Sequence, residues 1–346
     1  MSTRPGRIRV ARLTDFAVLG ELSRLAQQGA PDVRSLGLPV SGPRIGVFSL
    51  FRLPLGAFRP HDLLYVYEDD GLAGLIRVER ETSRDEWTIV ELDAIGMAEA
   101  GDIRFRLVQH ILRDGSKRGA IRFHVACADA AGNVELFMQA GFARYGEELL
   151  LFRPPGTALP DAWTDERVAE QGIRPTGPTD AVALSRLYAA VTPQPVQRLE
   201  AYRIGDWERQ GTSWRVPRSS LAPILRLADV EAFVREAPGG GPDGTRLDAF
   251  LQVGIAKEDQ PHYLRILARA DADTAPLVEY GLGVISARTR NAGRSDHGVI
   301  APVRTYESPI DRRLEEAGFA LESTVTLLMK ETVVRVAEPA LVPAVR

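Results

Sequence analysis

Along the first part of the chain, short runs that alternate apolar and polar residues lie between apolar runs of helical period. Thr14 and Asp15 supply helix-capping side chains after the first alternating run, and Asp70-Gly71 between two such runs indicates a hairpin. Gly119 and Gly141 each end a predicted helix. The pattern predicts strands at 8–12, 63–69, 72–82, 86–95, 121–127 and 142–152, and helices at 16–26, 103–118 and 131–140.

The opening of this pattern occurs twice. The segment IRVARLTDFAVLGEL at 8–22 is matched by IRPTGPTDAVALSRL at 173–187, at a constant offset of 165 residues. A second pair, FMQAGFARYGEELLLF at 137–152 and LEEAGFALESTVTLLM at 314–329, has an offset of 177. Solenoid repeats are about 20–50 residues long, so a repeat of this length indicates two similar domains. We predict domains at 1–153 and 172–336, a linker at 154–171 and a tail at 337–346.

The second half has its own series of predicted elements. Its helical region continues to about Arg203, and the glycine-rich segment 239–244 is interpreted as a long hairpin loop, because no P-loop lysine follows it. Antiparallel strands come first in each half and an α/β crossover follows, which predicts an α/β (α+β) fold with a mixed sheet. Further strands are predicted at 229–237, 246–257, 261–271 and 298–303, and helices at 275–288 and 308–318.

Composition excludes several classes of function. The net charge is −3, which offers no surface of the kind that neutralises nucleic-acid phosphates. The five histidines have no metal-ligand spacing, and the one cysteine, Cys127, is predicted to be a small buried residue of a strand. No apolar run is long enough to span a membrane and the first residues lack a signal-peptide core. We therefore expect a cytoplasmic protein with no metal, nucleic-acid or membrane partner.

The ordered run from 103 to 152 carries a resemblance to a known family. It consists of a helix, a Lys-Arg-Gly turn, a strand, a short helix, Ala-Gly-Phe and a last strand. With the repeat, this order resembles the GNAT (N-acetyltransferase) superfamily in a tandem arrangement. The resemblance implies two tandem GNAT-like acyl-CoA N-acyltransferase domains, with acetyl-CoA or another acyl-CoA as co-substrate.

GNAT enzymes hold the CoA pyrophosphate on backbone N–H groups of an R/Q-x-x-G-x-G/A segment at a helix N-terminus. Here residues 96–106 read GMAEAGDIRFR, in which Gly101 matches the motif, whereas Ala98 and Ile103 depart from it. In the second half, residues 270–275 contain two aspartates and no glycine, and the aspartates would repel a pyrophosphate. The resemblance thus implies a cofactor site in the first domain, at Gly101, Asp102, Ile103, Arg104 and Arg106. The alternative for the two arginines is a solvated helix face.

The family also uses a tyrosine four residues before the glycine of its Gly-Phe pair to protonate the departing thiolate. These positions hold Phe137 and Leu314, neither of which can donate a proton. Tyr145 and Tyr306 lie nearby in the sequence as substitutes.

The predicted strand 86–95 carries the candidate base of an acyl transfer. Strand alternation would place Glu91 and Asp93 on one face with Trp87, Ile89 and Ile95. Carboxylates on such an apolar face are poorly solvated, which raises their pKa toward that of a useful base. In the alternative interpretation this face meets solvent or pairs with Arg77. The corresponding strand of the second half offers Arg265 and Arg269 instead of acids.

Two functions remain open at this point. The first is an acyl-CoA-dependent N-acyltransferase that acts on a small amine with one domain only. The second is a non-catalytic GNAT-fold module that binds a ligand or a partner. The acceptor, the acyl length and the oligomeric state do not follow from the sequence.

Overall fold

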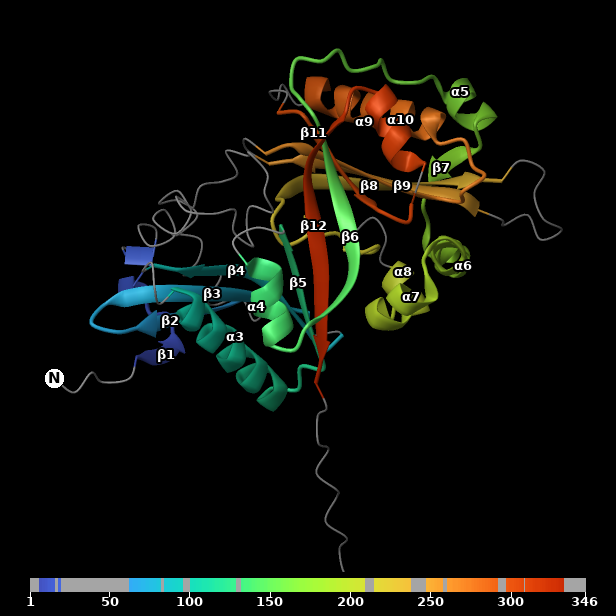
Figure 1. Cartoon of the computed structure of the whole chain (residues 1–346). Helices are drawn as coiled ribbons and strands as arrows, with labels where there is room; N and C mark the ends of the chain where they lie inside the picture. The colour runs from blue at the N-terminus through green and yellow to red at the C-terminus, as the bar shows by residue number, and fades with distance from the viewer. Residues whose placement is uncertain are drawn as a thin grey trace, which may run out of the picture.

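The computed structural model describes residues 6–15, 18–19, 62–81, 84–95, 100–128, 132–208, 215–237, 247–257, 260–291, 297–307 and 309–332. The twelve strands of these residues form one mixed sheet in the order β1-β2-β3-β4-β5-β12-β6-β11-β10-β9-β8-β7. Helices pack on both faces, which confirms the predicted mixed α/β class (Figure 1). Below, the first half means the described residues up to 153 and the second half those from 154.

The first half follows the predicted order closely. The helix predicted at 16–26 falls largely outside the described residues. Within this range the structure describes Val18 and Leu19, and both are helical. Its strands and helices are β1 (Arg7–Val10), β2 (Asp62–Glu68), β3 (Leu72–Glu81), β4 (Glu86–Ala94), α3 (Ala100–Lys117), β5 (Arg122–Ala128), α4 (Asn133–Gln139) and β6 (Ala143–Arg153).

The second half repeats this series after α5 (Asp165–Glu170). The predicted glycine-rich loop lies outside the described residues, but the strands on either side of it pair antiparallel as a hairpin. The remaining elements are β7 (Ile173–Pro175), α6 (Ala181–Val191), α7 (Gln194–Glu200), α8 (Ile204–Trp207), β8 (Leu227–Glu236), β9 (Leu247–Ala256), β10 (His262–Ala268), α9 (Ala275–Asn291), β11 (Val299–Arg304), α10 (Ile310–Glu316) and β12 (Ala320–Glu331).

The repeated sequence folds into repeated contacts. Arg9 donates two hydrogen bonds to Asp15, and Arg174 donates two to Asp180, at the same offset of 165 residues. In each Ala-Gly-Phe segment the glycine has a left-handed φ, +87° at Gly141 and +89° at Gly318. Glycine adopts this conformation without a steric penalty, which explains why both short helices end there.

The last strands of the two halves are exchanged. β12, from the end of the second half, pairs antiparallel with β5 of the first half, and β6, from the first half, pairs antiparallel with β11 of the second. β6 and β12 also pair with each other and run side by side through the middle of the molecule (Figure 1). Each half therefore completes its sheet with a strand of the other, and the domain boundaries at 153 and 172 stay a prediction.

The predicted linker packs against the rest of the second half. Arg153 donates to the carbonyl oxygens of Thr157 at 3.2 Å, Ala158 at 2.8 Å and Ala317 at 3.0 Å. Trp163 donates to Glu279 at 3.1 Å. The segment contains the helix α5, whose N-cap Thr164 accepts a hydrogen bond from a backbone N–H.

Candidate active site

Strands β4 and β5 pair only at their first residues. Parallel pairing runs from Glu86 opposite Arg122 to Ile89 opposite Val125, and then stops although both strands continue. A pocket lies at this point, between the two halves. It is lined by residues of the first half (Glu79, Glu81, Arg84, Thr88, Ile89, Val90, His124, Val125, Ala126 and Tyr145), of the second-half segment 202–224 (Tyr202, Asp206, Arg215, Val216, Arg218, Ser219, Ser220, Ala222, Pro223 and Ile224) and by Leu327.

A β-bulge in β4 corrects the predicted faces of this strand. Arg77 lies opposite Glu91 and Val78 lies opposite Ile89, so Val90 is the extra residue. A bulge reverses the alternation of side chains beyond it. Trp87 and Ile89 pack with Leu92 in the core beneath α3.

Glu91 and Asp93 therefore lie on the opposite face, and the prediction that they share a face with Trp87 and Ile89 was wrong. Both carboxylates are 2% exposed, and Glu91 pairs with Arg77 at 3.2 Å (Oε2 to Nε), as the alternative interpretation had it. Ile95 does share their face, where it packs with Leu75.

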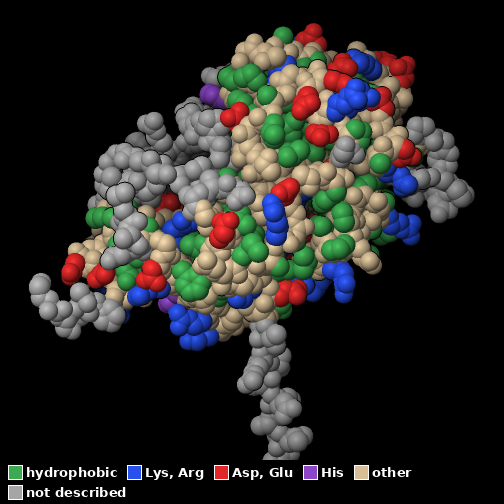
Figure 2. Space-filling model, viewed as in Figure 1, with side chains coloured by type: hydrophobic (Ala, Val, Ile, Leu, Met, Phe, Trp, Pro, Cys, Tyr) green, Lys and Arg blue, Asp and Glu red, His purple; other side chains and the backbone are tan. Residues whose placement is uncertain are grey.

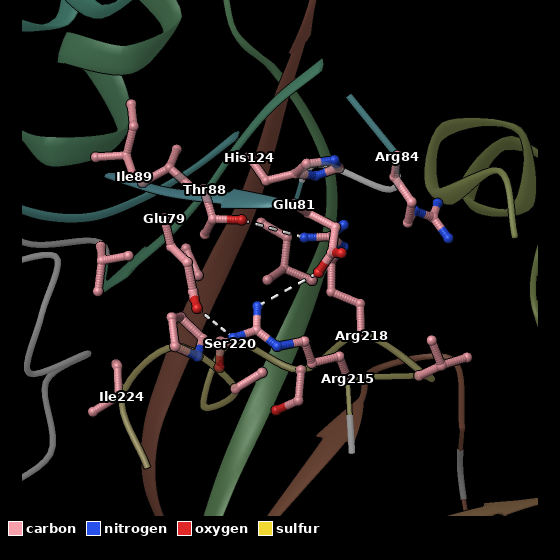
Figure 3. Close-up of a pocket in the computed structure, with 18 of the residues that line it drawn as sticks. Glu79, Glu81, Arg84, Thr88, Ile89, His124, Arg215, Arg218, Ser220 and Ile224 are labelled. Atoms are coloured by element: carbon pink, nitrogen blue, oxygen red, sulfur yellow. Dashed lines mark hydrogen bonds and ion pairs between the residues drawn. The ribbon is translucent and has the colours of Figure 1, made fainter. Parts of the chain in front are cut away.

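Ion pairs join the walls of the pocket. Arg215 pairs with Glu79 and lies 3.7 Å from Glu81, both on β3, while Arg218 donates to Thr88 at 3.5 Å (Figure 3). On the same side, Arg84 pairs with Asp206 at 2.7 Å. The second half thus supplies one wall of a pocket whose floor is the sheet of the first half.

Glu86 is a buried anion beside the pocket, in contact with the lining residues Arg84, His124 and Arg218. It is 1% exposed and contacts Arg84 at 3.1 Å, Arg122 at 3.4 Å and Arg218. Burial by itself would raise the pKa of Glu86, but nearby His124 and the charges of Arg218 and Arg84 outweigh it. The pKa is held well below the ordinary glutamate value, so Glu86 is ionised at neutral pH.

His124 lies beside Glu86 on β5. Its Nε2 is 3.4 Å from a Glu86 carboxylate oxygen, and its side chain is almost fully buried on the pocket wall (Figure 3). Burial and the charge of Arg218 lower the pKa of His124 to about 4 although Glu86 opposes the shift, so the ring is neutral at pH 7.

Tyr145 lies at a bulge of β6, between the register pairs Leu327–Gly146 and Leu328–Arg144. Its ring contacts His124 edge to face, with 6.4 Å between ring centroids. Burial raises the pKa of Tyr145 to about 12, so its hydroxyl keeps its proton at neutral pH and can act as a donor. Of the two tyrosines noted in the sequence, Tyr145 lines this pocket. Tyr306 borders a separate hollow of the second half, beside Arg269.

The corresponding strand pair of the second half is bridged by a buried ion pair. β10 and β11 pair only at His262–Val299 and Tyr263–Ile300. Arg265, 1% exposed, donates two hydrogen bonds of 2.6 Å to Glu307 and one of 3.0 Å to the carbonyl oxygen of Pro302 on β11. A buried ion pair of this quality occupies the place where the strands separate.

The two helix N-termini after these strand pairs also differ. At α9, the carboxylate of Asp273 accepts a hydrogen bond from the N–H of Ala275 at 3.2 Å, which places a negative charge at the helix start. At α3, a methyl group added to Gly101 would meet no atom within 4 Å. The first turn of α3 also carries an aspartate, Asp102, but its carboxylate pairs with Arg106.

The predicted cofactor residues are all placed in the first turns of α3, but they differ in availability. Gly101 and Asp102 are exposed, and Asp102 pairs with Arg106 at 2.7 Å. The side chain of Ile103 is buried in the core, and Arg104 donates to Asn133 of α4. Only backbone groups and exposed side chains of this turn could meet a ligand.

Sequence reasoning missed the residues that the fold brings into the pocket and beside it. Glu86 and His124 lie 38 positions apart and were not connected, because their contact depends on the register of two parallel strands. The second-half segment 202–224 was not considered at all. A signal was present in β5, where a histidine interrupts an otherwise apolar strand whose Cys127 is buried as predicted.

Acidic and basic side chains are interspersed on the face of the molecule shown in Figure 2. Within the described residues, no group of three or more histidine, cysteine, aspartate or glutamate side chains is arranged to hold a metal ion. No helix in the described part of the chain is long and apolar enough to cross a membrane.

No protein-family model and no curated protein matches this sequence. Solved structures do match the fold. A tandem GNAT protein from the clavulanic acid biosynthesis pathway is 13% identical, with a TM-score of 0.53 over 94% of this chain and 98% of that one. A GCN5-related N-acetyltransferase from Sphaerobacter thermophilus is 15% identical, with a TM-score of 0.58 over 94% and 95%. A GCN5-related glucosamine N-acetyltransferase region of a fungal GH3 β-N-acetylglucosaminidase is 11% identical, with a TM-score of 0.56 over 95% and 38%. This chain therefore has the tandem GNAT fold that its sequence predicted.

Proposed function

We propose that this protein is an acyl-CoA-dependent N-acyltransferase that acts on a small amine and that its chemistry takes place in the first half. The observation that carries this proposal is the contrast between the two places where parallel strands separate. Between β4 and β5 there is a pocket, whereas β10 and β11 are bridged by the buried Arg265–Glu307 ion pair, and the hollow beside this pair is bordered by the acidic residues Glu307 and Asp271. An acyl chain and its thioester need an open position of this kind, and the first half has one.

The start of α3 supports the same half. Gly101 is exposed, and the backbone N–H groups of Gly101, Asp102 and Ile103 suit a pyrophosphate, since the N–H groups of a first helical turn lack intrahelical partners. Asp273 opposes an anion at the start of α9, whereas the charge of Asp102 at the start of α3 is paired with Arg106. Acetyl-CoA or another acyl-CoA would supply the activated acyl group, and the protein would supply orientation and proton transfer.

The acceptor amine would enter from the pocket side of the sheet. This wall carries Glu79 and Glu81 from the first half and Arg218 from the second, so an amine with a further polar group is suited to it. Glu91 and Asp93 lie on the pocket-side face of β4 and are retained as proposed bases from the sequence. Tyr145 is proposed as the donor that protonates the departing thiolate, because it lines the pocket and keeps its proton.

One observation favours the non-catalytic alternative. Arg104 is engaged with Asn133 and Arg106 with Asp102, so both predicted phosphate contacts have partners inside the protein. Calorimetric titration with acetyl-CoA and a longer acyl-CoA separates the two functions. We expect binding together with protection of amides 100–108 from hydrogen exchange. Protection confined to 268–280 would move the site to the second half, and absence of binding would leave only the non-catalytic module.

A further inference from the structure

His124 lies where the pocket needs a base. It is opposite Thr88 in the register of β4 and β5, one pair before the last pair, Ile89 with Val125. Its ring is on the pocket side of the sheet, since neighbouring Phe123 and Val125 pack in the core beneath α3. A group on this wall is next to the place where an acyl thioester would enter between the strands.

The ring has a nitrogen available. His124 is 3% exposed, and within the described residues neither ring nitrogen makes a hydrogen bond, although Nε2 lies 3.4 Å from Glu86. Buried polar atoms without partners are rare and call for an explanation, such as a ligand or a catalytic role. Because the ring is neutral at pH 7, one of its nitrogens carries a lone pair that can accept a proton.

Glu86 is placed to stabilise the ring once it is charged. Its carboxylate oxygen lies 3.4 Å from Nε2, and the arginines around Glu86 keep it ionised. This arrangement resembles other pairs in which a buried carboxylate orients a histidine and stabilises the imidazolium. The charged and titratable groups facing His124 from the surrounding elements are Glu86 on β4, Arg84 before it, Arg218 from the second half and Tyr145 on β6.

We propose that His124 is the base that accepts the proton of the acceptor amine, directly or through one water, and that Glu86 is a positioning residue that orients and stabilises it. This inference rests on the proposed acyl transfer. It assigns to His124 the role that the sequence suggested for Glu91. His124 lines the pocket, whereas Glu91 pairs with Arg77 and is not among the lining side chains described above.

The reaction step balances with these groups. The lone pair of a neutral amine forms a bond to the acyl carbon of the thioester, and the bond from this carbon to sulfur breaks with its electron pair on sulfur. The nitrogen becomes positively charged when it bonds, and its proton passes to His124. The thiolate takes a proton from Tyr145, and the proton on His124 returns to Tyr145 through water. The products are an amide and a free thiol.

The test uses the full-length chain, acetyl-CoA as acyl donor and a panel of primary amines that includes putrescine, ethanolamine and glycine. Thiol release is measured with each amine. His124→Gln should lower kcat by roughly 10²–10⁴-fold, the usual contribution of a positioned base, with the acetyl-CoA dissociation constant nearly unchanged. His110→Gln is the matched control, because His110 is a partly buried histidine of the same half whose ring meets Tyr65 edge to face and does not line the pocket.

Two further measurements separate proton transfer from packing. His124→Ala should regain rate when imidazoles are added, and the regained rate should rise with the basicity of the imidazole. Glu86→Gln should lower kcat and move the acid limb of the rate profile to lower pH, because Glu86 opposes the lowering of the His124 pKa.

The outcomes distinguish this inference from the function on which it rests. If acetyl-CoA does not bind and no amine of the panel is acylated, the proposed function fails and the inference fails with it. If the wild type acylates an amine and folded His124→Gln does so at an undiminished rate, only the assignment of His124 is overturned. A loss in His124→Ala that imidazoles do not restore, with an unchanged pH profile in Glu86→Gln, would also overturn it.

Discussion

Arg304 of the second half lies opposite Glu148 of the first, with 3.1 Å between the guanidinium Nε and the carboxylate Oε2. The two side chains are 1% and 0% exposed, and they lie on the neighbouring strands β11 and β6. Arg304 also pairs with Glu200 at 3.1 Å. This contact exists only because the last strand of the first half completes the sheet of the second.

Arg304→Met should lower the free energy of unfolding by roughly 3–5 kcal/mol, because Glu148 and Glu200 would remain buried without a compensating charge. Urea denaturation measures the change. Arg312→Met is the control, because the Arg312 side chain is 78% exposed and pairs with Glu316 on the surface. This variant should lose less than about 1 kcal/mol of unfolding free energy. Equal losses of unfolding free energy in the two variants would show that the buried ion pair stabilises the fold no more than the surface pair does.

Proteolytic cleavage within the predicted linker 154–171 should not separate the two fragments. β6 lies between β12 and β11, so the fragments would remain joined by ladders of backbone hydrogen bonds on both sides of β6. Size-exclusion chromatography of the nicked protein should give one species at the original volume, which dissociates only in denaturant. Fragments that separate in native buffer would argue against the exchanged strands.

Ala126→Trp should abolish acyl-CoA binding, because an indole at this position would project into the pocket where β4 and β5 separate. Calorimetry with acetyl-CoA measures the effect. Ala190→Trp provides a matched control, because Ala190 lines the hollow beside Tyr306 in the second half. This variant should bind acetyl-CoA with a dissociation constant within about threefold of the wild-type value, which is less than the tenfold change that corresponds to about 1.4 kcal/mol. The reverse pattern would place the acyl-CoA site in the second half.

The Glu91→Gln variant tests whether Glu91 or His124 accepts the proton of the amine. If Glu91 takes the proton, kcat should fall by roughly 10²–10⁴-fold, with a smaller effect for Asp93→Asn near the strand end. We expect the loss to be much smaller than that of His124→Gln, since Glu91 pairs with Arg77. Rates of thiol release in the three variants show which residue is the base. A full loss of rate in Glu91→Gln alone would identify Glu91, and not His124, as the base.

The unfolding free energy should fall as the pH is lowered from 7 to 5. His124 has a pKa of about 4 in the folded protein and about 6.5 when unfolded, so in this window the unfolded chain binds the proton and the folded protein does not. The loss should be roughly 2 kcal/mol over these two pH units. Glu86 does not add to it, because its lowered pKa affects stability only below the unfolded glutamate value.

Urea denaturation at both pH values, in the wild type and in His124→Gln, measures this effect. The variant should lose most of the pH dependence. His110→Gln should remove a smaller part, since burial lowers the pKa of His110 in the same direction. A His124→Gln variant whose stability changes with pH as much as that of the wild type would contradict the buried neutral ring.

The sequence alone predicted the elements of each half, their duplication and the GNAT fold. Local patterns carry this information, because alternation, capping residues and left-handed glycines act on neighbouring positions. Asp15 and Asp180 illustrate it, since each is bound by an arginine six residues earlier in its own half.

The tertiary structure decided the faces of β4, the partners of the last strands and the members of the pocket. One extra residue at Val90 reverses the faces of Glu91 and Trp87, and alternation cannot reveal a bulge. Strand exchange places β12 beside β5, although sequence similarity only shows that β6 and β12 are alike. The contact of His124 with Glu86 follows from the pairing of two strands, and the second-half wall follows from the packing of two halves. These contacts join residues distant in the chain, so no local pattern specifies them.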